Sequence, residues 1–242
     1  MILSGLIKCF VETYKDKATR NRPALILKSS AADFSPIDRG QIISKIEQIC
    51  NTVGGGKNLP NIYLVHGDLT NEEMNSLYNH PKVKAHITFT KGEGFGRPLA
   101  EASLSEKVIV APNWSGQVDF LKHSVKLEGQ LTNVHPSAVW ENVILPESQW
   151  FSVNYKHASD AFKYVSDKKN QKQLNILAKR QARFIKENVA MKNMEEQLIG
   201  YLEKYASGVP TQVALNLPKL KKKEPELNSP KLKLPKLKKV ES

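Results

Sequence analysis

The residues best placed for chemistry form the stretch from Gly92 to Glu101, which reads Gly-Glu-Gly-Phe-Gly-Arg-Pro-Leu-Ala-Glu. It combines three glycines, a proline suited to the first turn of a helix, and two glutamates separated by seven residues. A strand-like run leads into it and a helix-like run follows. A strand that stops at glycines and restarts as a helix leaves main-chain N–H groups unpaired, and the helix dipole favours an anion beside them. The stretch is therefore predicted to bind phosphate or another anion.

The two carboxylates of this stretch need a further explanation, because an anion site alone gives them no ligand. Carboxylate oxygens accept hydrogen bonds strongly from hydroxyl groups, so Glu93 and Glu101 fit a ligand that carries sugar as well as phosphate. The alternative is that Glu101 is a solvated helix residue and Glu93 a partner of the helix dipole. The glycines alone also fit a tight turn of a parallel sheet. These residues by themselves leave both interpretations open.

Strand-like apolar runs alternate with helical patterns on both sides of the stretch. The predicted strands are 24–28, 61–67, 84–90, 107–112 and, more weakly, 124–127. We expect Asp38 to cap one helix, and Thr70 to form a capping box with Glu73 at the next. The alternation predicts an α/β fold, with a Rossmann-like parallel sheet and helices on both faces. Ligands of such sheets bind at the carboxyl ends of the strands, where this sequence places glycines and polar residues.

The rest of the chain predicts a helical end and a tail. Residues 129–153 have no regular pattern, residues 156–167 suggest a helix, and residues 171–205 suggest one long charged helix. Beyond residue 217 the segment Pro-Lys-Leu-Lys occurs three times, and residues 218–242 hold nine lysines against three glutamates. Such a composition cannot bury a core. We therefore expect one domain over 1–207 and a disordered Lys/Pro/Leu-rich tail over 208–242.

Composition narrows the classes of protein. The formal net charge is +12 over 242 residues, but much of it lies in the tail, so the body gives little indication of nucleic-acid binding. We expect Cys9 and Cys50 to be core thiols, and the six histidines have no metal-ligand spacing. The sequence has no signal-peptide pattern and no apolar run of about 20 residues. These features favour a cytoplasmic protein without a metal.

Several segments in order resemble the family 4 (group 1) retaining glycosyltransferases, which have the GT-B fold. That family has a glutamate, seven residues and a second glutamate, with Gly-Phe-Gly after the first, as in residues 93–101. Residues 65–78 resemble its strand, glycine and helix that pack on the nucleotide base. Residues 108–116 resemble the strand and glycine turn that follow the signature. Residues 2–125 are thereby similar to the C-terminal, donor-binding domain of these enzymes.

The resemblance implies a site for the sugar and diphosphate of a nucleotide-sugar. Glu93 is the implied catalytic residue and would contact the hydroxyls of the transferred sugar. Gly94, Phe95 and Gly96 would offer main-chain N–H groups to the sugar or the diphosphate, and Glu101 would bind the ribose. The resemblance implies no metal and no other cofactor.

It also implies a site for the base. Val65 and Gly67 would approach the base through their main chains, with His66 at the same strand end. Arg97 stands where the family has an aliphatic residue, and it is expected either to bind phosphate or to pair with a carboxylate. Lys28 is a possible source of positive charge at another strand end.

The family also has parts that this sequence lacks, namely an N-terminal acceptor domain and a first strand carrying an arginine and a lysine. The prediction is a retaining enzyme that moves a hexose from a nucleoside-diphosphate sugar to a glycan, lipid, small-molecule or protein acceptor, with a separate N-terminal half. The alternative is an inactive donor-domain relic whose basic tail binds nucleic acid or anionic membrane. A third possibility is an epimerase or phosphorylase of the same architecture.

Overall fold

The computed structural model describes residues 2–30, 34–54 and 58–206, so the predicted tail lies outside the described residues. The chain divides into two compact units, Met1–Ile199 and Gly200–Ser242. In the second unit the described residues, 200–206, include the end of the last helix, α7 (Met191–Tyr205). No helix in the described part of the chain is both long and apolar enough to cross a bilayer.

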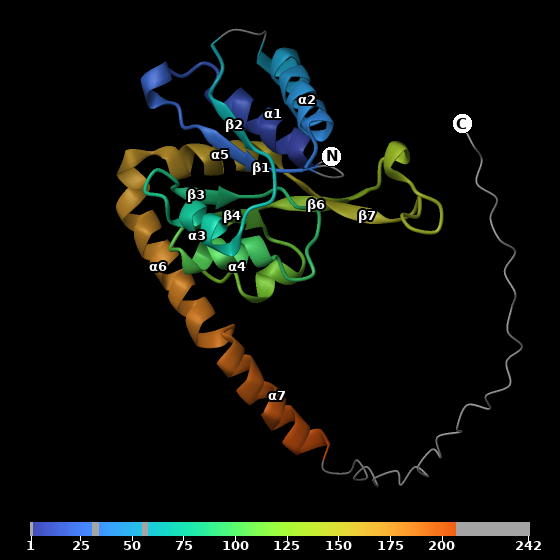
Figure 1. Ribbon diagram of the computed structural model, residues 1–242, viewed down its shortest axis with the longest axis vertical. Coiled ribbons are helices and arrows are strands. Elements are labelled where there is room, and N and C mark those ends of the chain that lie inside the picture. The colour runs from blue at the N-terminus through green and yellow to red at the C-terminus, as the bar shows by residue number, and fades with distance from the viewer. Residues whose placement is uncertain (1, 31–33, 55–57, 207–242) are drawn as a thin grey trace, which may run out of the picture. The chain divides into compact units, whose positions relative to one another are not determined.

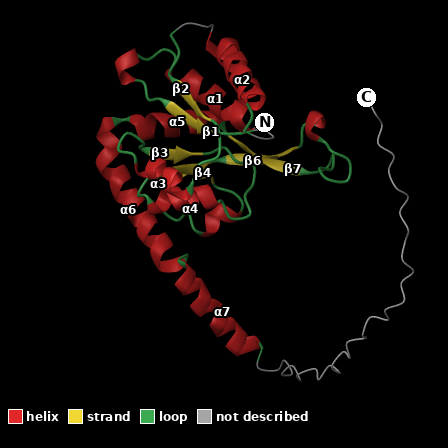
Figure 2. Ribbon diagram, viewed as in Figure 1, coloured by secondary structure: helices red, strands yellow, loops and turns green. Residues whose placement is uncertain are grey.

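The strands of the first unit form two parallel ladders (Figures 1 and 2). In the first ladder, β1 (Leu25–Lys28) pairs with β2 (Ile62–Val65). In the second, β4 (Val108–Pro112) lies between β3 (Ala85–Ile87) and β5 (Val125–Leu127). The predicted parallel strands are therefore present, although the strand expected over 84–90 is shorter. Among the described residues, no hydrogen-bonded strand pair joins the two ladders.

Helices cover both faces of the strands, as predicted. β4 is buried along its whole length, so its side chains alternate between two apolar cores. Val108 and Val110 belong to a core shared with three helices, α1 (Ile2–Tyr14), α2 (Pro36–Gly54) and α5 (Tyr155–Ser166). Ile109 and Ala111 belong to the opposite core, with α3 (Asn71–Asn79) and α4 (Arg97–Leu104). The helix α6 (Gln171–Asn188) contributes to both cores.

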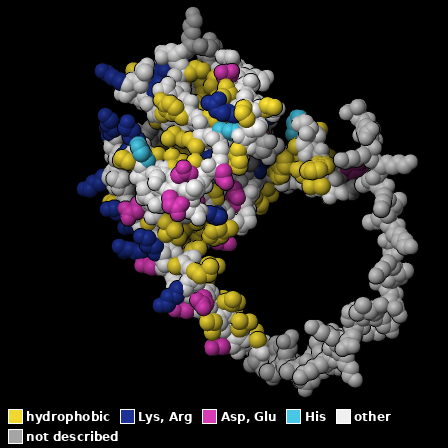
Figure 3. Space-filling view, in the orientation of Figure 1, with side chains coloured by type: hydrophobic (Ala, Val, Ile, Leu, Met, Phe, Trp, Pro, Cys, Tyr) yellow, Lys and Arg dark blue, Asp and Glu magenta, His cyan; other side chains and the backbone are white. Residues whose placement is uncertain are grey.

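Residues 129–153 were expected to be irregular, and this prediction is wrong. They contain an antiparallel hairpin of β6 (Gly129–Asn133) and β7 (Gln149–Val153). β6 is largely solvent-exposed, whereas β7 is mostly half-buried with Phe151 buried, and neither strand has a clear alternating apolar pattern. The backbones approach closely at Gly129, where an added Cβ would lie 2.2 Å from the Ser152 carbonyl oxygen. Apolar side chains of the connecting loop, Trp140 and Val143, are exposed. Figure 3 shows hydrophobic side chains at the surface of this part of the chain.

Two helix boundaries differ from expectation. The predicted helix over 171–205 is two helices, because the chain leaves helical geometry at Val189, a β-branched residue with φ −120° and ψ −1°. Asp38 lies in the first turn of α2 and not just before it, because the helix begins at Pro36, and Ser35 Oγ accepts the Asp38 N–H. The capping box of Thr70 and Glu73 is confirmed, with both reciprocal hydrogen bonds present.

The short helical segment after β4 differs from the prediction, whereas the two cysteines agree with it. The short helix expected after β4 is a 3₁₀ turn, Gly116–Asp119. Three further 3₁₀ turns are Thr19–Asn21, Pro136–Ala138 and Lys168–Asn170. Cys9 is a buried free thiol and Cys50 a half-buried one, as expected for core cysteines. Burial raises the pKa of Cys9 to about 11, so the thiol is unreactive at neutral pH.

Candidate functional site

The glycine-rich stretch forms a turn between β3 and α4, and its last glycine starts the helix. Gly96 is the N-cap of α4 and has φ +89°, a left-handed conformation that other residues rarely adopt. Its carbonyl oxygen accepts hydrogen bonds from the N–H groups of Leu99 (2.9 Å) and Ala100 (3.3 Å). An added Cβ would lie only 3.0 Å from Leu99 Cδ1. The backbone conformation therefore favours glycine here, and a Cβ would in addition require a small shift of the Leu99 side chain.

The main chain of Glu93 is held by the turn that follows β4. Ser115 Oγ donates to the Glu93 carbonyl oxygen (2.8 Å) and accepts the Glu93 N–H (3.0 Å). The Gly116 N–H donates to the same carbonyl oxygen at 3.0 Å. A Cβ on Gly116 would lie 2.0 Å from the Gly94 carbonyl oxygen, so only glycine fits. Sequence reasoning missed this role of Ser115, although it had noted the polar turn after the fourth strand.

The centre of the turn presents unpaired hydrogen-bond donors. The main-chain N–H groups of Gly94, Phe95 and Gly96 make no hydrogen bond to any described residue. Gly94 and Phe95 are exposed, and the Phe95 ring packs 4.8 Å from the ring of Phe120. Gln117 is fully buried just behind Gly96, and its Oε1 has no hydrogen-bond partner among the described residues. The turn therefore offers donors at a helix N-terminus, as an anion site requires.

Arg97 pairs with Glu101 across one turn of α4. Arg97 Nε lies 2.6 Å from Glu101 Oε1, and the two side chains are 75% and 34% exposed. Of the two roles expected for Arg97, the structure therefore shows the pairing with a carboxylate. Exposed pairs of this spacing contribute little to stability, because solvent and salt screen the two charges. A charged ligand at the turn can therefore displace the pair at little cost.

Two aromatic side chains, the buried Tyr78 and the half-buried His86, lie beside Glu101. Burial raises the pKa of Tyr78 to about 12 and lowers the pKa of His86 to about 4. Their rings are 5.9 Å apart and meet edge to face. Both are uncharged near pH 7, so Arg97 supplies the positive charge next to Glu101.

The residues expected to contact the base lie at the end of β2. His66 Nε2 lies 2.8 Å from Asp38 Oδ2, and both side chains are only 5% exposed. The imidazole is therefore held by Asp38 instead of being open to a ligand. Gly67 has φ +123°, and its carbonyl oxygen accepts a hydrogen bond of 2.8 Å from Lys28 Nζ. Sequence reasoning assigned Asp38 to a helix cap and so missed its contact with His66.

The site residues therefore fall into two groups, both at carboxyl ends of parallel strands as predicted. One group follows β3 and comprises Glu93, the Gly94–Gly96 turn, Arg97 and Glu101. The other is Val65–Gly67, at the end of β2. No hydrogen bond joins the two groups within the described ranges.

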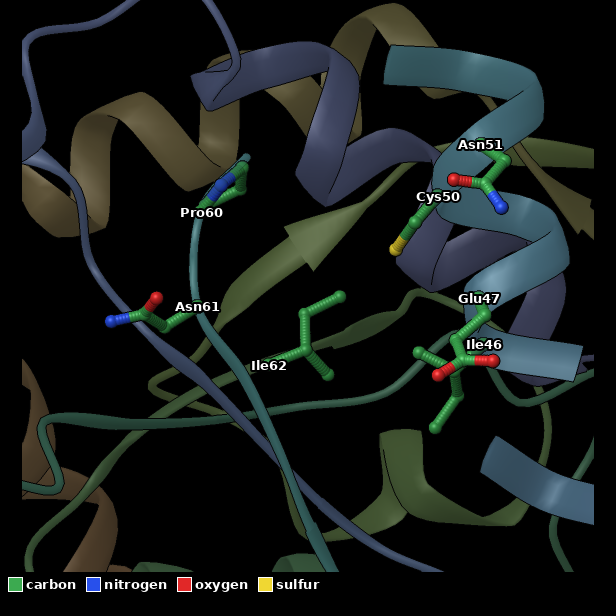
Figure 4. A pocket seen from close by; sticks show the side chains of 7 residues that line it. All are labelled: Ile46, Glu47, Cys50, Asn51, Pro60, Asn61 and Ile62. Atoms are coloured by element: carbon green, nitrogen blue, oxygen red, sulfur yellow. The ribbon is translucent and has the colours of Figure 1, made fainter. Parts of the chain in front are cut away.

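Two cavities lie away from these residues. One, of about 510 Å³, lies between α2 and the start of β2 (Figure 4) and is lined by Ile46, Glu47, Cys50, Asn51, Pro60, Asn61 and Ile62. Another, of about 300 Å³, lies at the base of the hairpin, beside Glu128 and Asn154. In the glycine turn, Gly94, Phe95 and Arg97 are exposed at the surface and Gly96 is buried. Among the described residues, no group of three or more His, Cys, Asp or Glu side chains is arranged to hold a metal ion.

Comparison with known proteins identifies the fold. No protein-family model matches the chain, and a search of curated proteins finds no match. A structure of trehalose-6-phosphate synthase, from work on glycosyl transfer with retention, matches with a TM-score of 0.56 and 12% identity, over 84% of this chain and 42% of that one. A structure described as "trehalose-6-phosphate from E. coli bound with UDP-2-fluoro glucose" matches with a TM-score of 0.56 and 11% identity, over 84% and 41%.

A separate domain of similar length also matches. The C-terminal domain of a group 1 glycosyl transferase, LpcC from Francisella tularensis, has a TM-score of 0.51 and 15% identity, over 78% of this chain and 80% of that domain. The chain spans less than half the length of the trehalose-6-phosphate synthase structure. It therefore has the α/β fold of the C-terminal domain of GT-B glycosyltransferases.

Proposed function

We propose that the chain binds a nucleoside-diphosphate sugar and forms the donor half of a retaining hexosyltransferase. The observation that carries the proposal is the turn itself. Three unpaired N–H groups, of Gly94, Phe95 and Gly96, lie at the start of a helix between the carboxylates of Glu93 and Glu101. The likeness to a structure bound with UDP-2-fluoro glucose supports the same ligand class.

Each group has a role in this proposal. The N–H groups and the Arg97 guanidinium bind the diphosphate and stabilise its charge as the bond to the sugar breaks. Glu93, whose main chain is fixed by Ser115, accepts hydrogen bonds from the sugar hydroxyls. Glu101 exchanges its partner Arg97 for the ribose hydroxyls.

The base lies against the end of β2 in this proposal. The main chain of Val65 and Gly67 contacts it, while the buried pair of His66 and Asp38 fixes the position of that strand end. The sugar is transferred with retention to a glycan, lipid, small-molecule or protein acceptor held by a separate N-terminal half. No metal takes part, since N–H groups and Arg97 provide the positive charge.

The test is calorimetric titration of the full chain with UDP-glucose, ADP-glucose and GDP-mannose. We expect one donor to bind, and Glu93→Gln and Glu101→Gln each to weaken its binding at least about tenfold through lost charge-assisted hydrogen bonds. Glu106→Gln, which removes an exposed carboxylate after the end of α4, is the matched control and should leave the affinity unchanged. If no donor binds, or if all three variants behave alike, the proposal is wrong.

A further inference from the structure

The exposed ring of Trp114, beside the glycine turn, has no role in the proposed function. Trp114 lies on the turn after β4 and is 40% exposed. Its indole stacks on the ring of Phe151, with the ring centroids 5.9 Å apart and an angle of 4° between the planes. The indole N–H makes no hydrogen bond to any residue in the described part of the chain. An aromatic ring with an unused donor suits a ligand that has an apolar face and a polar rim.

The residue that follows Trp114 has a strained main chain. Ser115 has φ +71° and ψ −168°, a region that residues other than glycine rarely occupy. Such strain persists only where the surrounding structure enforces it, and it is common at ligand-binding sites. Here Ser115 Oγ is hydrogen-bonded to both the N–H and the carbonyl oxygen of Glu93, at 3.0 and 2.8 Å. The strained residue therefore couples the position of Trp114 to that of Glu93.

A second set of contacts joins Trp114 to the segment just ahead of the glycine turn. The Phe151 N–H donates to the Lys91 carbonyl oxygen at 3.4 Å, so β7 lies against that segment. The Lys91 ammonium in turn lies over the face of the Trp150 ring, 4.2 Å from its centroid. Because Phe151 also stacks on Trp114, the indole is held from two sides, by Ser115 and by β7. Both sides lead to residues 91–93, so the ring lies beside the segment that begins the proposed site.

We propose that Trp114 is a stacking platform for a pyranose ring bound beside Glu93. A pyranose ring has C–H groups on its face and hydroxyl groups around its rim. The C–H groups pack on the indole face, whose π electrons carry partial negative charge, and a rim hydroxyl accepts the unused indole N–H. This inference rests on the proposed function, which assigns Glu93 to sugar hydroxyls. The ring belongs either to the transferred hexose or to a sugar of the acceptor, and the test distinguishes the two.

Nuclear magnetic resonance of the indole N–H groups tests the platform directly. The chain has three tryptophans, so a ¹⁵N-labelled sample reports on each indole separately, and the variant Trp114→Phe assigns the Trp114 signal. The full chain is titrated with maltose and methyl α-glucoside, and separately with UDP-glucose, ADP-glucose and GDP-mannose. We expect the Trp114 signal to shift, while that of Trp140, an exposed ring in the hairpin loop, stays in place. A Trp114 signal that none of these sugars moves, or equal shifts of both signals, would overturn the proposal.

Titration with the matching nucleoside diphosphates identifies which sugar occupies the platform. A shift of the Trp114 signal with a nucleotide-sugar, but not with its nucleoside diphosphate, assigns the platform to the transferred hexose. A shift with the free saccharides alone assigns it to an acceptor sugar. Equal shifts with a nucleotide-sugar and its nucleoside diphosphate would contradict a sugar contact. The proposed function fails if no nucleotide-sugar binds, whereas the platform fails on the Trp114 signal, so the two failures are distinguishable.

Affinities of substituted chains provide a second test, with the sugar that shifts the Trp114 signal as the ligand. Trp114→Leu removes the aromatic face and should weaken binding about tenfold, whereas Trp114→Phe keeps a ring against Phe151 and should lose less. Trp140→Leu, which removes an exposed ring elsewhere, is the matched control and should leave the affinity unchanged. Thermal denaturation checks that each variant is folded. An affinity of Trp114→Leu equal to that of the unsubstituted chain would overturn the proposal.

Discussion

At the scale of single residues, alanine substitutions at Gly94 and Gly116, which lie on facing turns, are expected to have different effects on stability. A Cβ on Gly116 would lie 2.0 Å from the Gly94 carbonyl oxygen, whereas a Cβ on Gly94 would meet nothing within 4 Å. Gly116→Ala is therefore expected to destabilise the fold by about 1–3 kcal/mol and to abolish donor binding. Gly94→Ala should leave the melting temperature unchanged but weaken donor binding, because its methyl group occupies space beside the proposed diphosphate.

Thermal denaturation and calorimetric titration of both variants check this prediction. Gly200→Ala, at another position without a neighbour within 4 Å, controls for the general effect of replacing glycine. Equal melting temperatures for Gly94→Ala and Gly116→Ala would contradict the close approach of the two turns.

His86 predicts a dependence of stability on pH. Burial lowers its pKa to about 4 in the folded chain, a shift that the charge of Glu101 only partly offsets, against 6.5 when it is unperturbed. Between these values the unfolded chain binds the additional proton, so stability rises with pH and is lost on acidification, by at most about 1.4 kcal/mol per pH unit. Urea denaturation from pH 7 to pH 4.5 should show a shallower loss for His86→Gln. If the free energy of unfolding falls equally with pH in the unsubstituted chain and in His86→Gln, His86 is not the origin of the pH dependence.

At the scale of elements, the capping box of α3 carries a prediction about stability. Thr70 Oγ1 accepts the Glu73 N–H at 3.2 Å, and Glu73 Oε2 accepts the Thr70 N–H at 2.8 Å. Thr70→Ala should lower the free energy of unfolding by about 1 kcal/mol. The double variant Thr70→Ala/Glu73→Ala should lower it by less than the sum of the two single-variant losses. Thr52→Ala, on the exposed surface of α2, is the control and should have little effect. Additive losses in denaturant unfolding would mean that the two residues act independently.

The elements that the sequence predicted are those with strong local patterns. The buried β4 and the capping box of α3 depend on residues adjacent in the chain, so their positions follow from composition and spacing. The hairpin of β6 and β7 depends on pairing between Gly129 and Val153 and has no apolar alternation to reveal it. The long-range contacts of the site were missed for the same reason. Ser115 is 22 residues from Glu93, and Asp38 is 28 residues from His66.

At the scale of the whole chain, the tail distinguishes the proposed enzyme half from an interaction module. Residues 208–242 hold nine lysines against three glutamates, and they lie outside the described residues. Under the proposed function, deleting them leaves the affinity for the donor unchanged, which calorimetric titration measures. Retention on heparin that falls with salt and is lost on deletion would show the electrostatic binding expected of the alternative. A deletion variant that no longer binds the donor would contradict the assignment of the site to the turn.

The division of the strands into two ladders has a consequence for how the two groups of site residues are held apart. The residues proposed for the base end one ladder, and those proposed for the sugar and diphosphate follow the other. Among the described residues no strand pair joins the ladders, so the distance between the two groups depends on side-chain packing in the apolar core that both ladders share. A substitution deep in that core would thereby alter donor affinity without touching any residue of the site.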